Sequence, residues 1–288
     1  MKIQSWFLAV GGGIALISVA RAGVIFSQDF SSAPNGPVST YLGSPPNNTQ
    51  FDTINWSGTG MSGGIVNGAL QYTRSAGGFG WFARNTDFSP TPNAVIYSFD
   101  LGVTGNNFAQ SSAATWQIGS GFSTASGAEQ LNLVNSRFGI ELTATAGTYR
   151  FLTMAGGSSA DVSGPKTITW VINNSGAALT YLAPDNSQHS VDNNSWDLWA
   201  NTDPVFQNVA ATTPGRSLTD IKFAYDKGYA TIRMDNFSIR TVQPVPEPGA
   251  TGVVAVAFLI VVACGGTIRA KSVAVLRAWH SHRISWRQ

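Results

Sequence analysis

The feature that most constrains the fold is the absence of a sustained helical period between residues 23 and 243. Short apolar or alternating runs recur there instead, interrupted by turn-forming residues about every 8 to 15 positions. Alternation is typical of strands with one buried face. A region of about 220 residues is long enough for one large domain. The sequence therefore predicts an all-β protein with a single β-sandwich domain, a jelly roll, over residues 23–243.

The last predicted strand of this domain changes its apolar side midway. Ile232 and Met234 share one side of an ideal strand, whereas Phe237 and Ile239 share the other. A bulge near Asp235-Asn236 would bring all four side chains to the same side. Burial of both sides of the strand is the alternative.

Two turn-rich segments are predicted to close hairpins. Ala146-Gly147 separates two apolar runs, and Asn174-Ser175-Gly176 separates residues 166–173 from residues 178–183. Polar and turn-forming residues dominate residues 156–164 and 184–195, so these two segments are predicted to be loops.

The first residues have the pattern of a targeting segment. Lys2 precedes an apolar run over residues 6–19, and Ala20-Arg21-Ala22 then forms a small-x-small cleavage site. Residues 1–22 are therefore predicted to be a secretory signal peptide, cut before Gly23. An uncleaved membrane anchor is the alternative.

The last residues have the pattern of a membrane anchor. Residues 250–268 carry no charge, and a helix of that length spans about 28 Å, close to the thickness of a bilayer core. They are predicted to be a transmembrane helix, and the prolines of residues 244–249 a stiff linker before it. Residues 269–288 are predicted to be a basic cytoplasmic tail by the positive-inside rule. The basic residues of this tail are Arg269, Lys271, Arg277, Arg283 and Arg287.

Together, the motif Val245-Pro246-Glu247-Pro248-Gly249, the apolar span and the Arg-rich end resemble the PEP-CTERM sorting domain of Gram-negative bacteria. The resemblance covers residues 244–288. It implies that an exosortase, an integral membrane protease, recognises Pro246, Glu247, Pro248 and Gly249 and processes the tail. It also implies a transient single-pass anchor in the inner membrane, followed by residence in the cell envelope, at the outer surface or in the extracellular matrix. A plain membrane anchor with a proline linker is the alternative.

The second half of the central domain carries a further resemblance. It is similar to a domain seen in many PEP-CTERM proteins, which looks like the laminin-G and concanavalin-like jelly rolls. Many of those jelly rolls bind glycans. The segments that carry the resemblance are Ile168-Thr169-Trp170-Val171-Ile172-Asn173-Asn174, Trp196-Asp197-Leu198-Trp199 and Met234-Asp235-Asn236-Phe237-Ser238-Ile239.

The charge of the central region differs in sign from that of the whole chain. The 288 residues have a net charge of +2, but residues 23–243 hold ten basic and fourteen acidic residues, a net charge of −4. An acidic domain lacks the basic patch that a nucleic-acid partner requires. The single cysteine, Cys264, lies in the predicted span, so the domain forms no internal disulfide.

No catalytic residue is predicted. His189 is the only histidine of the central region, so it alone could serve a Ser-His-Asp triad, and its polar surroundings favour a solvated loop histidine. The only glutamates of this region, Glu129 and Glu141, lack the closely spaced carboxylate partners typical of jelly-roll glycosidases. Two carboxylates from different strands could still converge, so a carbohydrate-active hydrolase remains the alternative to a non-enzyme.

Two tryptophans after a polar segment are the candidates for stacking on sugar rings. Trp196 and Trp199 are the better candidates for exposure, with Asn193, Asn194 and Asp197 as polar neighbours. Burial in the core, where most tryptophans of a sandwich lie, is the alternative. Side chains alternate along a strand, so the two indoles form one platform only if a turn or bulge separates them. These features favour a non-catalytic protein that contacts exopolysaccharide. A purely structural envelope protein without a ligand is a further alternative.

One pair of carboxylates is a candidate calcium site. Asp29 lies in the first predicted strand and Asp235 in the last, and these strands are often neighbours in jelly rolls. With backbone carbonyls, the two carboxylates would supply the oxygen ligands that Ca²⁺ prefers. Two unrelated acids at strand edges are the alternative.

Overall fold

The computed structural model describes residues 23–43 and 49–242. The chain divides into two compact units, Met1–Pro244 and Val245–Gln288, and every described residue belongs to the first. The predicted signal peptide, proline linker, sorting motif, transmembrane helix and basic tail therefore lie outside the described residues. Among the described residues, no helix is long and apolar enough to cross a membrane.

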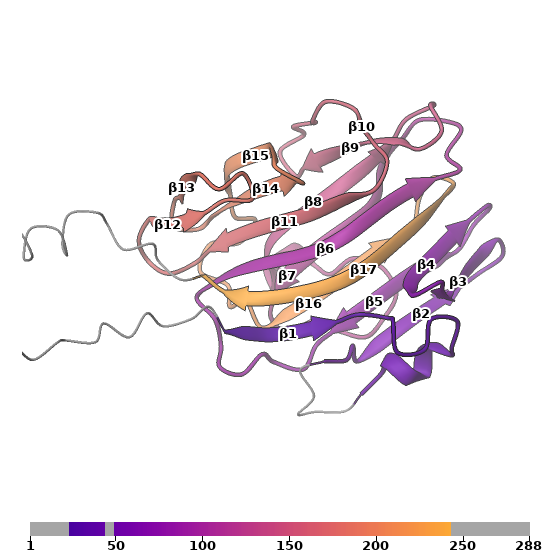
Figure 1. The fold of residues 1–288 in the computed structure, drawn as a ribbon, viewed down its shortest axis with the longest axis horizontal. Helices are drawn as coiled ribbons and strands as arrows, with labels where there is room; N and C mark the ends of the chain where they lie inside the picture. The colour runs from indigo at the N-terminus through magenta and orange to yellow at the C-terminus, as the bar shows by residue number, and fades with distance from the viewer. Residues whose placement is uncertain (1–22, 44–48, 243–288) are drawn as a thin grey trace, which may run out of the picture. The chain divides into compact units, whose positions relative to one another are not determined.

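Two antiparallel sheets pack face to face (Figure 1). The eight-stranded sheet has the order β15-β14-β11-β6-β17-β4-β3, and β1 also pairs with β17. Its strands are β1 (Val24–Gln28), β3 (Met61–Val66), β4 (Ala69–Arg74), β6 (Ala94–Thr104), β11 (Lys166–Asn173), β14 (Ser195–Ala200), β15 (Asp203–Ala210) and β17 (Ala230–Thr241).

The seven-stranded sheet has the order β10-β9-β8-β7-β16-β5-β2. Its strands are β2 (Thr53–Ser57), β5 (Phe79–Arg84), β7 (Gln110–Gly119), β8 (Val134–Leu142), β9 (Thr148–Thr153), β10 (Val162–Ser163) and β16 (Asp220–Tyr225). Two short 3₁₀ segments, η1 (Val38–Tyr41) and η2 (Leu131–Leu133), complete these layers. Late strands lie between early ones, with β16 between β5 and β7 and β17 between β4 and β6. This is Greek-key connectivity, and the predicted all-β sandwich is confirmed.

Aromatic side chains fill the space between the two sheets. Trp116 stacks on Phe99 and on Phe138, with ring centroids 5.5 and 5.1 Å apart. Phe237 of β17 lies 5.5 Å from Phe99 and 5.3 Å from Phe82. Because large aromatic rings bury much apolar surface, this cluster supplies the core that a domain without a disulfide needs.

The register of β17 shifts between Asp235 and Ser238, opposite β6. As a result Ile232, Met234, Phe237 and Ile239 all belong to the same core cluster. The predicted bulge is confirmed. It explains how a strand whose apolar residues change side can bury all of them against one sheet.

One of the two predicted hairpins is correct. Ala146-Gly147 joins β8 to β9, which pair with each other. The segment Asn174-Ser175-Gly176 does not close a hairpin, because β11 pairs with β6 and β14 on its two sides. The chain leaves the sheet there and forms a separate hairpin of β12 (Leu179–Leu182) and β13 (Gln188–Val191). The predicted loop of residues 184–195 thus contains β13 and the first residue of β14.

The β12–β13 hairpin covers part of the outer face of the eight-stranded sheet. Leu179, Tyr181 and Val191 of the hairpin pack against Val171 and Trp199, in a second hydrophobic cluster separate from the main core. This end of the sheet is therefore buried on both faces.

Candidate functional site

The structure corrects the prediction that Trp196 and Trp199 are exposed. Trp196 is 1% exposed in the main core, and Trp199 is 0% exposed in the cluster beneath the β12–β13 hairpin. They lie on opposite faces of β14, as strand alternation requires. Neither indole can stack on a sugar in this structure.

The predicted polar neighbours of these tryptophans are used within the fold. The side-chain oxygens of Asn193 and Asn194 accept hydrogen bonds from the backbone N–H groups of Gly176 and Gly215, at 2.8 and 2.9 Å. Asp197 is buried, and it accepts hydrogen bonds from the hydroxyl of Tyr181 at 2.6 Å and from a backbone N–H at 2.7 Å. These oxygens therefore help to hold the fold together.

The predicted calcium pair is brought together, since β1 pairs with β17. The carboxylate of Asp29 accepts hydrogen bonds from the backbone and hydroxyl of Ser31, at 3.0 and 2.7 Å. That of Asp235 accepts one from the backbone of Phe30 at 3.4 Å. Burial raises the pKa of Asp235, and these hydrogen bonds lower the pKa of Asp29. The described residues contain no group of three His, Cys, Asp or Glu side chains that could hold a metal, so calcium binding at this pair stays a prediction.

Exposed aromatic side chains gather at one end of the sandwich. Phe79 is 43% exposed and Tyr229 is 41% exposed. Tyr229 meets Phe108 edge to face, with ring centroids 5.0 Å apart. We call Phe79, Phe108 and Tyr229 the aromatic patch. The β4–β5, β6–β7 and β16–β17 connections that carry it lie at the same end of the sheets (Figure 1).

A single guanidinium ties the aromatic patch together. Arg74 donates to the carbonyl of Gly78, just before Phe79, at 3.0 Å. It also donates to the carbonyl of Gly228, just before Tyr229, at 2.6 Å. Its guanidinium carbon lies 5.6 Å from the centre of the Tyr229 ring, within the range of a cation–π contact. Both turns are thereby fixed relative to each other.

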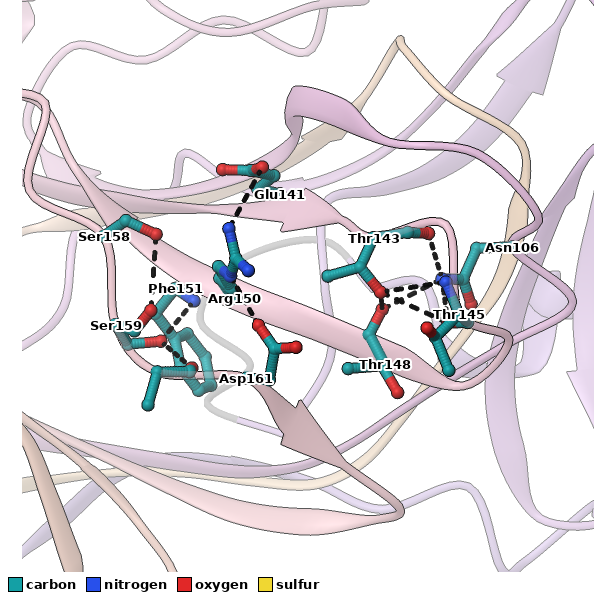
Figure 2. Close-up of polar contacts among 11 residues, drawn as sticks. Asn106, Glu141, Thr143, Thr145, Thr148, Arg150, Phe151, Ser158, Ser159 and Asp161 are labelled. Carbon is teal, nitrogen blue, oxygen red and sulfur yellow. Dashed lines mark hydrogen bonds and ion pairs between the residues drawn. The ribbon is translucent and has the colours of Figure 1, made fainter.

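Asn106 holds the loop that carries Phe108 (Figure 2). Its amide nitrogen lies 2.8 to 2.9 Å from the carbonyl oxygens of Thr143, Thr145 and Thr148. Its amide oxygen accepts from the backbone of Gly147 at 2.8 Å. Asn106 is fully buried, so these contacts join the β6–β7 loop firmly to the β8–β9 turn.

The outer face of the seven-stranded sheet is polar and partly covered by residues 120–130, which we call the 120–130 loop. Lys222 of β16 donates to the carboxylate of Glu129 at 2.5 Å and to the carbonyl of Ser123 at 3.1 Å. Trp81 of β5 donates to the carbonyl of Thr124 at 2.9 Å. The loop is thus attached to the sheet by a buried ion pair and an indole.

Asp220 lies beneath the same loop. Its carboxylate accepts a hydrogen bond from the backbone of Phe122 at 2.8 Å, and it is 1% exposed. Burial raises the pKa of Asp220 to about 6. A shifted pKa is a feature of many catalytic acids, but a side chain sealed from solvent cannot reach a substrate.

The two glutamates of the described chain both face cations. Burial opposes ionisation of Glu129, yet hydrogen bonds from Lys222 and Ser123 outweigh it and lower the pKa. Glu141 lies 3.8 Å from Arg150, which also donates to Asp161 (Figure 2). A general acid in a glycosidase needs a raised pKa. The lowered pKa of Glu129 is the opposite of this. Glu141 contacts Arg150 in an ion pair, as a structural counter-ion would.

Sequence reasoning missed the aromatic patch, although a signal was present. Phe79 and Tyr229 each directly follow a glycine, Gly78 and Gly228, whose backbone has positive φ. An aromatic residue that adjoins such a turn starts its strand at the rim of the sheet, where the core does not cover it. Strand patterns alone point instead to the strand interiors, where Trp196 and Trp199 lie.

Comparisons with known proteins find only distant similarities, all of them to solved structures. No family model and no curated protein matches it. A carbohydrate esterase from Shiga toxin-encoding bacteriophage phi24B aligns with a TM-score of 0.44 and 8% identity, covering 77% of this chain and 99% of that one. The metal-free carbohydrate recognition domain of Emp46p aligns at 0.41 and 9%, covering 72% and 96%. A glycoside hydrolase family 131 catalytic domain from Coprinopsis cinerea aligns at 0.41 and 10%, covering 79% and 99%. Similarities with such low TM-scores and identities say nothing about the ligand or the reaction of this protein.

Proposed function

We propose that the protein is an exported, non-catalytic envelope or extracellular-matrix protein that contacts exopolysaccharide through the aromatic patch. The observation that carries this proposal is that Phe79 and Tyr229 are exposed, with the half-buried Phe108 against Tyr229, on turns held by Arg74 and Asn106. Flat aromatic faces stack on the C–H surfaces of sugar rings. Because the platform is held rigid, its side chains lose little entropy when a ligand binds. This rigidity favours a role in ligand binding.

Export and sorting form the second part of the proposal. The signal-peptide pattern of residues 1–22, the motif Pro246-Glu247-Pro248-Gly249 and the apolar run after it support delivery to the cell envelope of a Gram-negative bacterium by an exosortase-like protease. In the native host, we expect the mature protein to begin at Gly23 and to lack the basic tail. Intact-mass measurement of the envelope form tests this. A mature, localised protein that still ends in Gln288 would reduce the tail to a simple anchor.

Glycan contact is tested by retention on the host's own exopolysaccharide. Tyr229→Ala and Phe79→Ala are each expected to reduce retention of the purified protein about fivefold, because each removes one stacking face of about 1 kcal/mol. Dense display on a surface would raise the weak affinity of each single site.

The matched control is Leu182→Ala. Leu182 is exposed like the aromatic patch, but it lies on the β12–β13 hairpin at the other end of the sandwich (Figure 1). Its removal should leave retention unchanged. If the wild-type protein is not retained at all, the proposed contact is wrong. Equal retention of the wild type and both aromatic variants would move the contact away from the patch.

A further inference from the structure

One cation on the outer face of the seven-stranded sheet has no counter-ion in the part of the chain that the structure describes. Arg137 lies in β8 opposite Gln117 of β7. Its neighbours in the strand, Phe138 and Ile140, belong to the core, so alternation places Arg137 and Gly139 on the outer face. Arg137 is half-buried there.

No described residue forms a hydrogen bond or an ion pair with the Arg137 side chain, and its Nε is buried without a partner. Burial lowers the pKa of Arg137, with no nearby carboxylate to oppose it. Partial removal of a charge from water without a compensating partner reduces stability. The remaining N–H donors of this half-buried guanidinium can still bind an anion.

The surrounding charges leave Arg137 unneutralised. Lys222, one strand beyond Gln117 in the same row, is already paired with Glu129. Arg150, on the same face of β9, is shared between two carboxylates (Figure 2). Both of these cations on the same face thus have their partners within the fold, whereas Arg137 has none among the described residues.

The residues beside Arg137 on this face have short side chains. The adjacent outward row contains Ala224, Thr115 and Gly139, whose side chains are short or absent. A Cβ at Gly139 would lie 2.9 Å from the backbone oxygen of Ala114, so the position accepts no larger residue without a shift. This row continues to Trp81 of β5 on one side and to Leu152 of β9 on the other.

We infer that Arg137 binds the carboxylate of an acidic sugar, so that the exopolysaccharide recognised by this protein contains uronic acid. This inference rests on the proposed function and names the chemical class of its ligand. A guanidinium presents paired N–H donors whose geometry matches a carboxylate, and such bonds are stronger than those between neutral groups. The carboxylate of the ligand supplies the negative charge that no described residue places beside Arg137.

Calorimetric titration of the full-length protein tests the inference. The probes are an oligomer of D-glucuronic acid, its carboxyl-reduced counterpart and a sulfated glucose oligomer. The wild type should bind the uronic acid oligomer about tenfold more tightly than the reduced one. Arg137→Gln should abolish that difference, and Arg137→Lys should keep only part of it because it loses the paired donors. Arg240→Gln is the control, since Arg240 is exposed on the other sheet.

Thermal unfolding supplies an independent measurement. Arg137→Met should raise the melting temperature by about 2 to 4 °C, because it removes an unpaired, half-buried charge. A lower melting temperature would identify Arg137 as a structural residue and overturn the inference.

The binding outcomes separate the two proposals. Equal binding of acidic and neutral oligomers, or preference for the sulfated one, overturns the uronic acid assignment and leaves the exopolysaccharide contact intact. Failure of the wild type to be retained on the native exopolysaccharide overturns the contact itself.

Discussion

Replacing Glu129 by glutamine is expected to lower the free energy of unfolding by about 3 to 5 kcal/mol, because it leaves the ammonium of Lys222 buried without a counter-charge. The two side chains are only 8% and 1% exposed. Removal of the carboxylate also weakens the acceptor for the backbone and hydroxyl of Ser123, at 2.8 and 2.9 Å. Chemical denaturation of the wild type and the variant measures the difference.

Two further variants show whether the effect comes from the buried charge. The double variant Glu129→Leu with Lys222→Met removes both charges and should recover most of the lost stability. Glu141→Gln breaks the more exposed pair with Arg150 and should cost less than about 1 kcal/mol. Because the pKa of Glu129 is lowered in the folded state, its contribution is present at neutral pH and is lost as the pH falls through that pKa. A Glu129→Gln variant as stable as the Glu141→Gln variant would contradict this account.

Asn106→Ala is expected to lower the free energy of unfolding by about 2 to 4 kcal/mol. The change leaves the backbone N–H of Gly147 and the carbonyls around Asn106 without their buried partner. It also frees the loop that carries Phe108, so retention on exopolysaccharide should fall further than the stability loss explains. Asn107→Ala is the matched control, since Asn107 is exposed and should change both quantities little. Unaltered stability of Asn106→Ala would show that the loop is held by other contacts.

The sandwich could be predicted from the sequence because strand alternation is visible in short stretches of neighbouring residues. Alternation along β6 and the change of face in β17 are written in consecutive residues, so the class and the bulge followed from them. Strands β2 and β3 carry only a weak local signal, since Ser, Asn and Gly are frequent in them and resemble turn residues. Local patterns also do not show which face of a strand is covered by another part of the chain.

The candidate site depended on contacts between distant residues. Trp196 and Trp199 follow a polar segment, which suggests exposure, but the β12–β13 hairpin folds over one face of β14 and the core covers the other. The missing counter-ion of Arg137 is likewise invisible in the sequence, because fourteen acidic residues in the central region offer it many potential partners. Only the arrangement of strands shows that each neighbouring carboxylate is already engaged.

The pairing of β1 with β17 has a mechanical consequence. Gly23 and Thr241 exchange hydrogen bonds, so the two ends of the domain leave it side by side. The aromatic patch adjoins the opposite end of β17, at Tyr229. A tension applied between a ligand held there and the chain after Thr241 therefore runs along β17, whose two edges are bonded to β6, β4 and β1. Such a load shears these ladders as a whole rather than opening them one bond at a time.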